Sequence, residues 1–553
     1  MLSLKFKYFL LFLFITFSGY SQVAPSKYWV QFTDKNNSPF SLSNPLTFLS
    51  QRCIDRRTAQ NISYNNLDLP VNPTYVSSVS ATGVTILNKS KWLNGVLIQT
   101  SNASHLAAVQ ALPCVAFTKS ANTGKSASEI TAINKFSSEN NTTEINTTPT
   151  EYGNAYNQIS QVSGDVLHIN NYKGQGKLIA VFDDGYRNCN TLAAFSHLYN
   201  NNKIKATWDF VANNTDVYND GAHGTQVFSV MAANLTNQYI GTAPEADYLL
   251  LRTEDSGSEY VIEEYNWLCA AEYADSAGVD VINSSLSYNV FNNSTQNHIY
   301  ADMNGDLTVI TKAADWAASK GILVVNSAGN EGQSGWKYIC APADGDSVLA
   351  VGAVDANNNY YNLSSTGPTS DARIKPNVCA LGNGASVIAF TGLIQASNGT
   401  SFSAPIIAGL AACLWQANPT LTNMEIFNFI VKSSSQYDNP NNTKGYGIPN
   451  FSYAWYLITG DGDNLNPQYG INTLYPNPFT ENLNLIYMPK DTQKTTVKLL
   501  DITGKTVYEN TKTTAANSYN KIEIPVLPTL TKGIYILQIG NSTEQITRKI
   551  IKE

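Results

Sequence analysis

Three short motifs place an aspartate, a histidine and a serine at the ends of predicted elements. The apolar strand LIAVF runs directly into Asp183, HGTQV puts His223 at the start of a helix, and GTSFSAP puts Ser401 at the start of another. A serine hydroxyl attacks a carbonyl when a base takes its proton and a carboxylate orients that base. The motifs therefore predict nucleophilic acyl transfer, with Ser401 as nucleophile, His223 as base and Asp183 as orienting group.

Acyl transfer also needs hydrogen-bond donors for the negative oxygen of the tetrahedral intermediate. The run VVNSAGNEG offers Asn330 on a loop that leaves a predicted strand. The backbone N–H of Ser401, at a helix N-terminus, is the natural second donor. Taken singly, each motif is more typical of a turn or a helix cap. Their occurrence together favours a catalytic role.

The elements that must position these groups are apolar strands separated by helices. Strands are expected at 178–182, 248–251, 279–282 and 322–326, and the helices between them include 261–276 and 308–319. Fully apolar strands that alternate with helices predict a parallel sheet covered on both faces. Ligands bind such sheets at the carboxyl ends of the strands. Pro405 is expected in the first turn of its helix, where a missing N–H is harmless.

The order Asp, His, Asn, Ser and the sequence around each resemble the subtilisin-like serine proteases over residues 183–412. The runs GTAPEA, VDVINSSLS, VLAVGAVD and SSTGPTSDARIKPN strengthen the resemblance. It implies a subtilisin-like α/β fold and a serine endopeptidase that works through an acyl-enzyme. It also implies that the backbone edge of Ser285, Leu286 and Ser287 pairs with an extended substrate. The segment of Ser327, Ala328 and Gly329 is implied to form the opposite wall of the specificity pocket. Such edge pairing binds main chain and suits a protease of broad sequence tolerance.

The chain departs from the family pattern without losing a catalytic group. Asp184 stands where a small or hydroxylated residue is usual, Phe402 and Ser403 where Met and Ala are frequent, and Asn377 where Asp is expected. Successive side chains of an extended chain face opposite ways, so only one of the two adjacent aspartates reaches His223. We expect Asp184 to be solvated or paired with a cation such as Arg187, because crowded carboxylates raise one another's pKa.

Composition divides the 553 residues into six segments. A basic start and an apolar run predict an export signal. Asn-, Ser- and Thr-rich sequence predicts a linker, and short alternating strands such as 495–501 predict a small β-sandwich tail. The α+β segment resembles the inhibitory propeptide of bacterial subtilisin-like enzymes, and YPNPF, DITGK and KGIYIL resemble the sorting domain of type IX secretion. The expected order is signal 1–21, propeptide 22–120, linker 121–150, catalytic domain 151–459, linker 460–472 and sorting domain 473–553.

Within the propeptide segment, the pattern predicts strands at 28–32, twice within 84–100 and at 114–118. It predicts an amphipathic helix over 45–59 and another helix over 104–112.

The net charge and the cysteines limit the kinds of partner and metal site that can be expected. A net charge of −7 argues against a nucleic-acid surface, which needs clustered Lys and Arg. The seven cysteines form no CxxC pair, and Cys269 and Cys413 are expected as buried thiols. No cofactor is expected for the chemistry and no metal ligands are assigned. Structural calcium stays open, since 302–308 resembles only half of a calcium loop.

Two functions of different class fit these features. The first is an active endopeptidase acting on proteins or peptides, held by its own propeptide, exported as a monomer through the type IX machinery, and found outside the cell or on its surface. The second is a surface binding protein on a degenerate protease scaffold. All four catalytic groups are present, which favours the first. The acidic run 254–264 is expected to be a solvated helix start.

Overall fold

The computed structural model describes most of the chain. The expected export signal, most of the linker 121–150 and nearly all of the linker 460–472 lie outside the described residues. The described ranges are 26–122, 141–142, 151–459, 470–475, 477–480, 483–489, 491–514, 520–525, 530–542 and 545–553.

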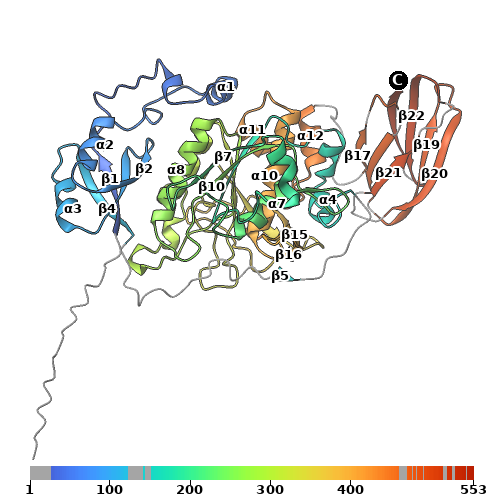
Figure 1. The fold of residues 1–553 in the computed structure, drawn as a ribbon. Coiled ribbons are helices and arrows are strands. Elements are labelled where there is room, and N and C mark those ends of the chain that lie inside the picture. The colour runs from blue at the N-terminus through green and yellow to red at the C-terminus, as the bar shows by residue number, and fades with distance from the viewer. Residues whose placement is uncertain are drawn as a thin grey trace, which may run out of the picture.

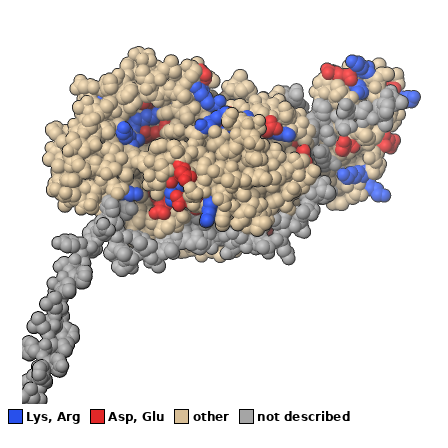
Figure 2. Space-filling view, viewed as in Figure 1, with Lys and Arg blue, Asp and Glu red and all other residues tan. Residues whose placement is uncertain are grey.

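The described residues form an N-terminal unit (26–122), a central unit (151–459) and a C-terminal unit (470–553). Figure 1 shows the N-terminal and C-terminal units on opposite sides of the central one. On the face drawn in Figure 2, basic and acidic side chains are interspersed among uncharged ones.

The N-terminal unit is a four-stranded antiparallel sheet in the order β2-β3-β1-β4, with helices of its own. The strands expected from the sequence are confirmed. Their bounds, with those of the helices, are β1 (Ser26–Phe32), α1 (Gln51–Ala59), α2 (Pro73–Ser80), β2 (Thr85–Ser90), β3 (Gly95–Thr100), α3 (Ala103–Gln110) and β4 (Val115–Asn122).

The helix expected over 45–59 is wrong as a single element. A 3₁₀ turn, η1 (Pro45–Thr47), ends before Ser50, whose hydroxyl accepts the Cys53 N–H at 3.1 Å and starts α1. A serine side chain satisfies an amide at a helix start, so the chain begins a new helix there. The helix α2 was not predicted, although Asn72 caps it and Pro73 is its first residue.

The central unit confirms the predicted parallel sheet. Seven strands pair in the order β14-β13-β12-β11-β6-β10-β7, all parallel. The expected strand at 279–282 lies two residues later in the structure. The strands are β6 (Leu178–Asp183), β7 (Ile204–Asp209), β10 (Asp247–Arg252), β11 (Val281–Ser284), β12 (Leu323–Ser327), β13 (Val348–Val354) and β14 (Val378–Leu381).

Helices cover both faces of this sheet, because alternate strand residues point to opposite sides. Ile179 and Val181 of β6 pack in one core with α7 and α10, whereas Ala180 and Phe182 pack in another with α8 and α9. The helices of the unit are α4 (Tyr156–Ser160), α5 (Asp165–Ile169), α6 (Ser196–Asn200), α7 (His223–Ala232), α8 (Ile262–Ala277), α9 (Val309–Ser319), α10 (Thr400–Ala417), α11 (Asn423–Lys432) and α12 (Phe451–Thr459).

Smaller elements complete the central unit. A three-stranded antiparallel sheet runs β15-β16-β5, so residues 141–142 of the expected linker pair with the central unit. These elements are β5 (Asn141–Thr142), β8 (Asn234–Leu235), β9 (Tyr239–Ile240), β15 (Ala385–Ile388) and β16 (Ile394–Ser397), with 3₁₀ turns η2 (Ala193–Phe195), η3 (Ser294–Gln296) and η4 (Tyr300–Asp302).

The N-terminal unit lies against the α8 and α9 face of the central unit. Its Trp29, Trp92 and Leu97 belong to the same apolar core as α8 and α9. Trp29 stacks on Tyr265 of α8 with ring centroids 5.1 Å apart.

The tail is built as two antiparallel sheets, β17-β18-β21 and β20-β19-β22-β23, around one apolar core, as the predicted β-sandwich requires. Its strands are β17 (Gly470–Tyr475), β18 (Leu483–Met488), β19 (Gln493–Leu500), β20 (Thr506–Thr514), β21 (Asn520–Ile524), β22 (Gly533–Gly540) and β23 (Gln545–Lys552).

Helix α10 and the seven cysteines are both placed by the fold. By length and composition α10 could cross a membrane, but 89% of it is buried inside the protein, as in the core helix of many globular domains. All seven cysteines lie in the described residues and are free thiols, with Cys269 and Cys413 buried as predicted.

Candidate active site

The structure brings Asp183 and His223 together across 40 residues of sequence. Asp183 is the last residue of β6 and His223 the first of α7. The Nδ1 of His223 lies 2.7 Å from Oδ1 of Asp183, and both side chains are buried. A buried carboxylate at this nitrogen fixes the imidazole tautomer and leaves Nε2 for a reacting group.

Gly224 permits this close approach of α7 to the end of β6. A Cβ on Gly224 would lie 2.8 Å from Cβ of Asp183 and even closer to the carbonyl oxygen of Gly185. Any larger residue would push the start of the helix, and His223 with it, away from the strand. The glycine of the HGT motif therefore allows the start of α7 to lie close to the end of β6.

The expectation that Asp184 is solvated or paired with Arg187 is wrong. Its side chain is buried, with 3% of the residue exposed, and Oδ1 accepts the N–H of Gly224 at 3.0 Å. Arg187 lies instead over the ring of Phe390, 4.6 Å from its centroid. Asp184 is therefore neither solvated nor paired with Arg187, because the start of α7 supplies backbone donors that satisfy an anion.

The setting of Asp184 raises its pKa. Burial is the largest cause and the charge of Asp183 the next, while His223 and the N–H groups of Gly224 and Ala222 act in the opposite direction. The two adjacent aspartates thus differ in their contacts: Asp183 contacts His223, and Asp184 accepts an N–H from the start of α7.

Ser401 is the second residue of α10, directly after Thr400. Its Oγ lies 3.5 Å from the carbonyl oxygen of Ser285, and its own carbonyl oxygen accepts the hydroxyl of Ser285 at 2.8 Å. Pro405 follows in the second turn, not in the first as predicted, because the helix already begins at Thr400. A proline there has no N–H for the carbonyl of Ser401, and Ser285 supplies the missing donor.

The side chain after Ser401 meets the histidine. Phe402 lies against the imidazole of His223 with ring centroids 5.7 Å apart, and helices α7 and α10 pack against each other. Sequence reasoning treated Phe402 only as a departure from the family pattern. Its position directly after Ser401, the predicted partner of His223, was the signal that could have placed it near the histidine.

Asn330 stands after β12, facing the start of α10. Its Oδ1 accepts two hydrogen bonds from Thr400, one from the backbone N–H at 2.9 Å and one from the hydroxyl at 3.0 Å. These donors fix which end of the amide is oxygen. The amide nitrogen Nδ2 therefore points away from the donors of Thr400.

The two predicted substrate segments are joined by a residue that sequence reasoning missed. Asn326, the fourth residue of β12, donates from Nδ2 to the carbonyl of Leu286 at 2.9 Å and to that of Ser327 at 2.7 Å. Ser285 and Leu286 are buried, whereas Ser287 is partly exposed. A lone asparagine in an apolar strand was the available signal.

The second segment is held from the opposite side. The N–H of Ala328 donates to Val351 of β13, and the carbonyl of Gly329 accepts from the N–H of Ser365, each at 2.9 Å. Gly329 has a φ of +102°, a conformation that side chains disfavour. The chain thus turns sharply just before Asn330.

The acidic start of α8 is buried, so the expected solvated helix start is wrong. Glu254, Glu263 and Glu264 are each 1% exposed. The hydroxyl of Tyr288 donates to Glu254, and Glu263 accepts the N–H of Asp255 at 2.9 Å. Tyr288, remote in sequence, covers Glu254, and polar donors satisfy these carboxylates.

Two groups of side chains in the described residues could hold a metal ion by their geometry: one around His223, and one formed by Glu254, Glu259 and Glu263. Asp183, Asp184 and His223 bring ligand atoms within 4.8 Å of one another, but the hydrogen bonds described above explain that grouping. In the half calcium loop, Asp302 accepts the N–H of Ile299 at 2.9 Å as a helix cap. The expectation that no cofactor is needed rests on the predicted acyl transfer, which uses only side chains and backbone groups of the protein.

Comparison with known proteins identifies the family. The subtilase family model of peptidase S8 matches residues 174–447. Subtilisin of Bacillus pumilus is 32% identical over 300 residues, which cover 54% of this chain and 97% of that protein. The chain belongs to the subtilase family. Subtilisin E of Bacillus subtilis is 32% identical over 285 residues, 51% of this chain and 66% of that protein, so the chain spans just under two thirds of it.

The flanking units of this subtilase match families as well. The peptidase S8 propeptide domain of Bacteroidota matches residues 27–139, and the secretion system C-terminal sorting domain matches 473–553. These matches indicate a secreted or cell-surface protein with a propeptide of its own. A solved structure, MycP1 from the ESX-1 type VII secretion system, aligns over 57% of this chain and 91% of that one, with 24% identity and a TM-score of 0.43.

Proposed function

We propose that this subtilase is a secreted serine endopeptidase that hydrolyses peptide bonds through an acyl-enzyme. Asp183, His223 and Ser401 form its triad, and Asn330 donates to the oxyanion. The observation that carries the proposal is the buried 2.7 Å contact between His223 and Asp183. This contact occurs in a family of serine peptidases, on a chain that keeps the serine and the asparagine.

In the proposed reaction, Nε2 of His223 takes the proton of Ser401 Oγ as the oxygen attacks the scissile carbonyl. Asp183 stabilises the imidazolium that results, and the proton then passes to the leaving amine. Nδ2 of Asn330 and the backbone N–H of Ser401 donate to the tetrahedral oxygen. Water repeats the sequence on the acyl-enzyme and restores Ser401.

Substrate is proposed to pair as an extended strand with the segment 285–287, and the segment 327–329 is proposed to form the opposite wall of its specificity pocket. The hydrogen bonds from Asn326 to both segments support this, because they hold the two backbones at a fixed separation. The carbonyl of Leu286 is already bonded, so pairing falls to the other backbone groups of 285–287. Main-chain recognition of this kind suits protein and peptide substrates of many sequences.

The other units are proposed to serve delivery and control. The chain acts as a monomer divided at the boundaries expected from the sequence, and the type IX machinery recognises residues 473–553. Deletion of these residues is expected to spare peptidase activity in cell extracts and to abolish delivery outside the cell. Normal delivery of the truncated protein would contradict this role.

The test of the proposed function is Ser401→Ala in the full chain. We expect loss of peptidase activity by about 10⁶-fold, the magnitude known for the nucleophile of subtilisin, a member of the same family. The propeptide should also stay covalently attached, since the enzyme's own site is expected to cut it. Undiminished hydrolysis by this variant would refute the proposal.

A further inference from the structure

The propeptide carries a segment that leaves its own sheet. Residues 44–68, which include η1 and α1 and are here called the anchor, follow β1 and precede α2. Figure 1 shows α1 away from the sheet that holds β1 and β4. The anchor lies against the end of α8 and the loops that follow α8 and α9.

One carboxylate of the catalytic unit holds the anchor by two arginines. Asp275, in the last turn of α8, is buried and lies 2.7 Å from Arg56 and 2.7 Å from Arg57. Lys91, from the turn between β2 and β3, lies 3.1 Å from the same carboxylate. Burial opposes ionisation, but Lys91, Arg57 and Arg56 together hold the pKa of Asp275 below its usual range.

The anchor also donates hydrogen bonds to backbone carbonyls at the carboxyl end of α8. The N–H of Ser50 donates to the carbonyl of Ser276 at 3.0 Å, and Nε of Arg52 donates to that of Gly278 at 3.0 Å. Helix ends present unpaired carbonyls and favour nearby cations. The last turn of α8 contains no basic residue of its own, so the propeptide supplies this charge.

Further contacts reach the loop after α9 and the start of α11. Gln60 donates from Nε2 to the carbonyl of Gly321 at 2.8 Å, and its Oε1 accepts the N–H of Asn423, the first residue of α11, at 3.0 Å. Asp68 bridges Arg57 and Lys320, at 2.8 and 3.1 Å. Arg57, Asp68 and Lys320 are all buried.

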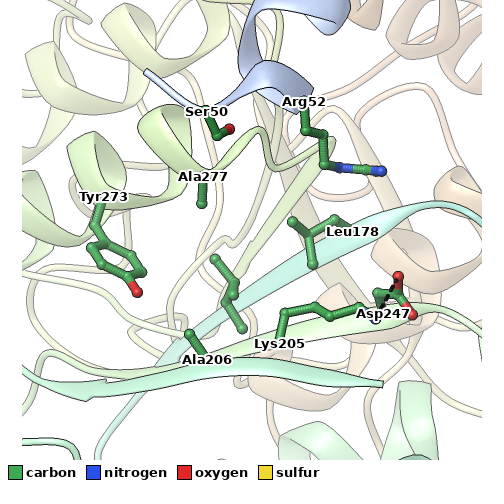
Figure 3. Close-up of a pocket in the computed structure, with 9 residues that line it drawn as sticks. Ser50, Arg52, Leu178, Lys205, Ala206, Asp247, Tyr273 and Ala277 are labelled. Carbon is green, nitrogen blue, oxygen red and sulfur yellow. Dashed lines mark ion pairs between the residues drawn. The ribbon is translucent and has the colours of Figure 1, made fainter. Parts of the chain in front are cut away.

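These contacts lie near the amino end of β6, whereas Asp183 of the proposed triad stands at its carboxyl end. Figure 3 shows Ser50 and Arg52 beside Leu178, the first residue of β6, in the wall of a cavity of about 410 Å³. Asp183 stands five residues later on the same strand, about 16 Å away at roughly 3.3 Å per residue. The anchor and the reacting groups therefore occupy separate surfaces.

We propose that residues 44–68 hold the propeptide on the catalytic unit through a second binding site, formed by Asp275, Gly321 and the start of α11. The inference deepens the proposed function, because it concerns how that enzyme retains its inhibitor. The anchor keeps the propeptide bound after the chain is cut between the two units, whatever occupies the triad. Release requires removal of buried charges from their partners.

The experiment measures release from a nicked full-length complex. A recognition sequence for an unrelated protease replaces part of 123–140 in the Ser401→Ala chain, so the cut does not depend on peptidase activity. After nicking, the rate at which the propeptide leaves the catalytic unit is followed by size-exclusion chromatography. Arg57→Gln should accelerate release about 100-fold or more, since it leaves Asp275 and Asp68 buried with too little positive charge.

Two further variants separate the anchor from general effects. Gln60→Ala removes the contacts to Gly321 and Asn423 without touching a buried charge, and we expect release to be about tenfold faster. Lys119→Gln removes one positive charge from an exposed position on β4, and its release should match that of the unsubstituted complex. Equal release rates for Gln60→Ala, Lys119→Gln and the unsubstituted complex would overturn the proposal, even if Arg57→Gln failed to fold.

Discussion

The hydroxyl of Ser285 donates a 2.8 Å hydrogen bond to the carbonyl oxygen of Ser401. This bond links the proposed nucleophile to the proposed substrate edge, and it occurs because Pro405 withdraws the helical donor that this carbonyl would have had. The start of α10 is thereby tied to the end of β11. The position of the nucleophile thus depends on the segment proposed to bind the substrate.

Ser285→Ala should destabilise the catalytic unit by about 1–3 kcal/mol, because it leaves the buried Ser401 carbonyl without a donor. Ser403→Ala is the matched control: Ser403 donates to the carbonyl of Thr400, which keeps its helical donor, so the loss should be smaller. Urea unfolding in the Ser401→Ala background, which prevents self-digestion, measures both. Equal losses would show that the Ser285 contact is incidental.

Asp183→Asn should lower turnover about 10⁴-fold, as replacement of the aspartate does in trypsin, another triad protease. Asp184→Asn should be mild, because an asparagine oxygen can still accept the N–H of Gly224. Steady-state kinetics on a peptide substrate, after circular dichroism confirms folding, compares the two. If Asp184→Asn were the crippled variant, the triad would have to be reassigned.

Asp184 also predicts a pH dependence of stability. Its pKa is raised in the folded protein, so the folded state holds a proton that the unfolded state has already lost as pH rises above the ordinary aspartate range near 3.9. Its contribution to the free energy of unfolding therefore falls as pH rises from there to the raised pKa. Asp184→Asn should flatten that fall in urea unfolding measured across this range, and an unchanged slope would exclude a raised pKa.

Asn330→Ala should lower kcat roughly 10² to 10³-fold with little change in KM, the magnitude known for the oxyanion asparagine of subtilisin. It also removes the acceptor for Thr400. Asn330→Asp is the control, because it keeps that acceptor and replaces the donor with an oxygen that carries negative charge. A loss of the same size or larger in Asn330→Asp assigns the effect to the donor, whereas near-normal turnover would make Asn330 only a structural cap.

The sequence predicted the groups that stand at element ends. Asp183 and His223 could be placed because an apolar strand and a helix start locate them without knowledge of the tertiary packing. The choice of Asp183 as the residue that contacts the histidine agrees with the Asp183–His223 distance, although Asp184 also lies close by. The burial of Asp184 could not be predicted, because the donors that satisfy it belong to a helix start 40 positions away.

Other features were missed for the same reason. The acidic run 254–264 is an ordinary solvated pattern until residues distant in sequence, such as Tyr288 at Glu254, contact it. Asn326 acts on the carbonyl of Leu286 in a neighbouring segment, 40 residues earlier. The break at Ser50 and the helix capped by Asn72 were different, since their local signals were present and were overlooked.

The central claim is that Ser401 is a nucleophile activated by His223. The most direct measurement is labelling of the processed protein with a fluorophosphonate probe, followed by mass spectrometry to locate the modified residue. We expect one rapidly modified serine, Ser401, with labelling abolished in Ser401→Ala and strongly slowed in His223→Ala. Labelling of a different serine, or a folded and processed protein that takes up no probe, would contradict it.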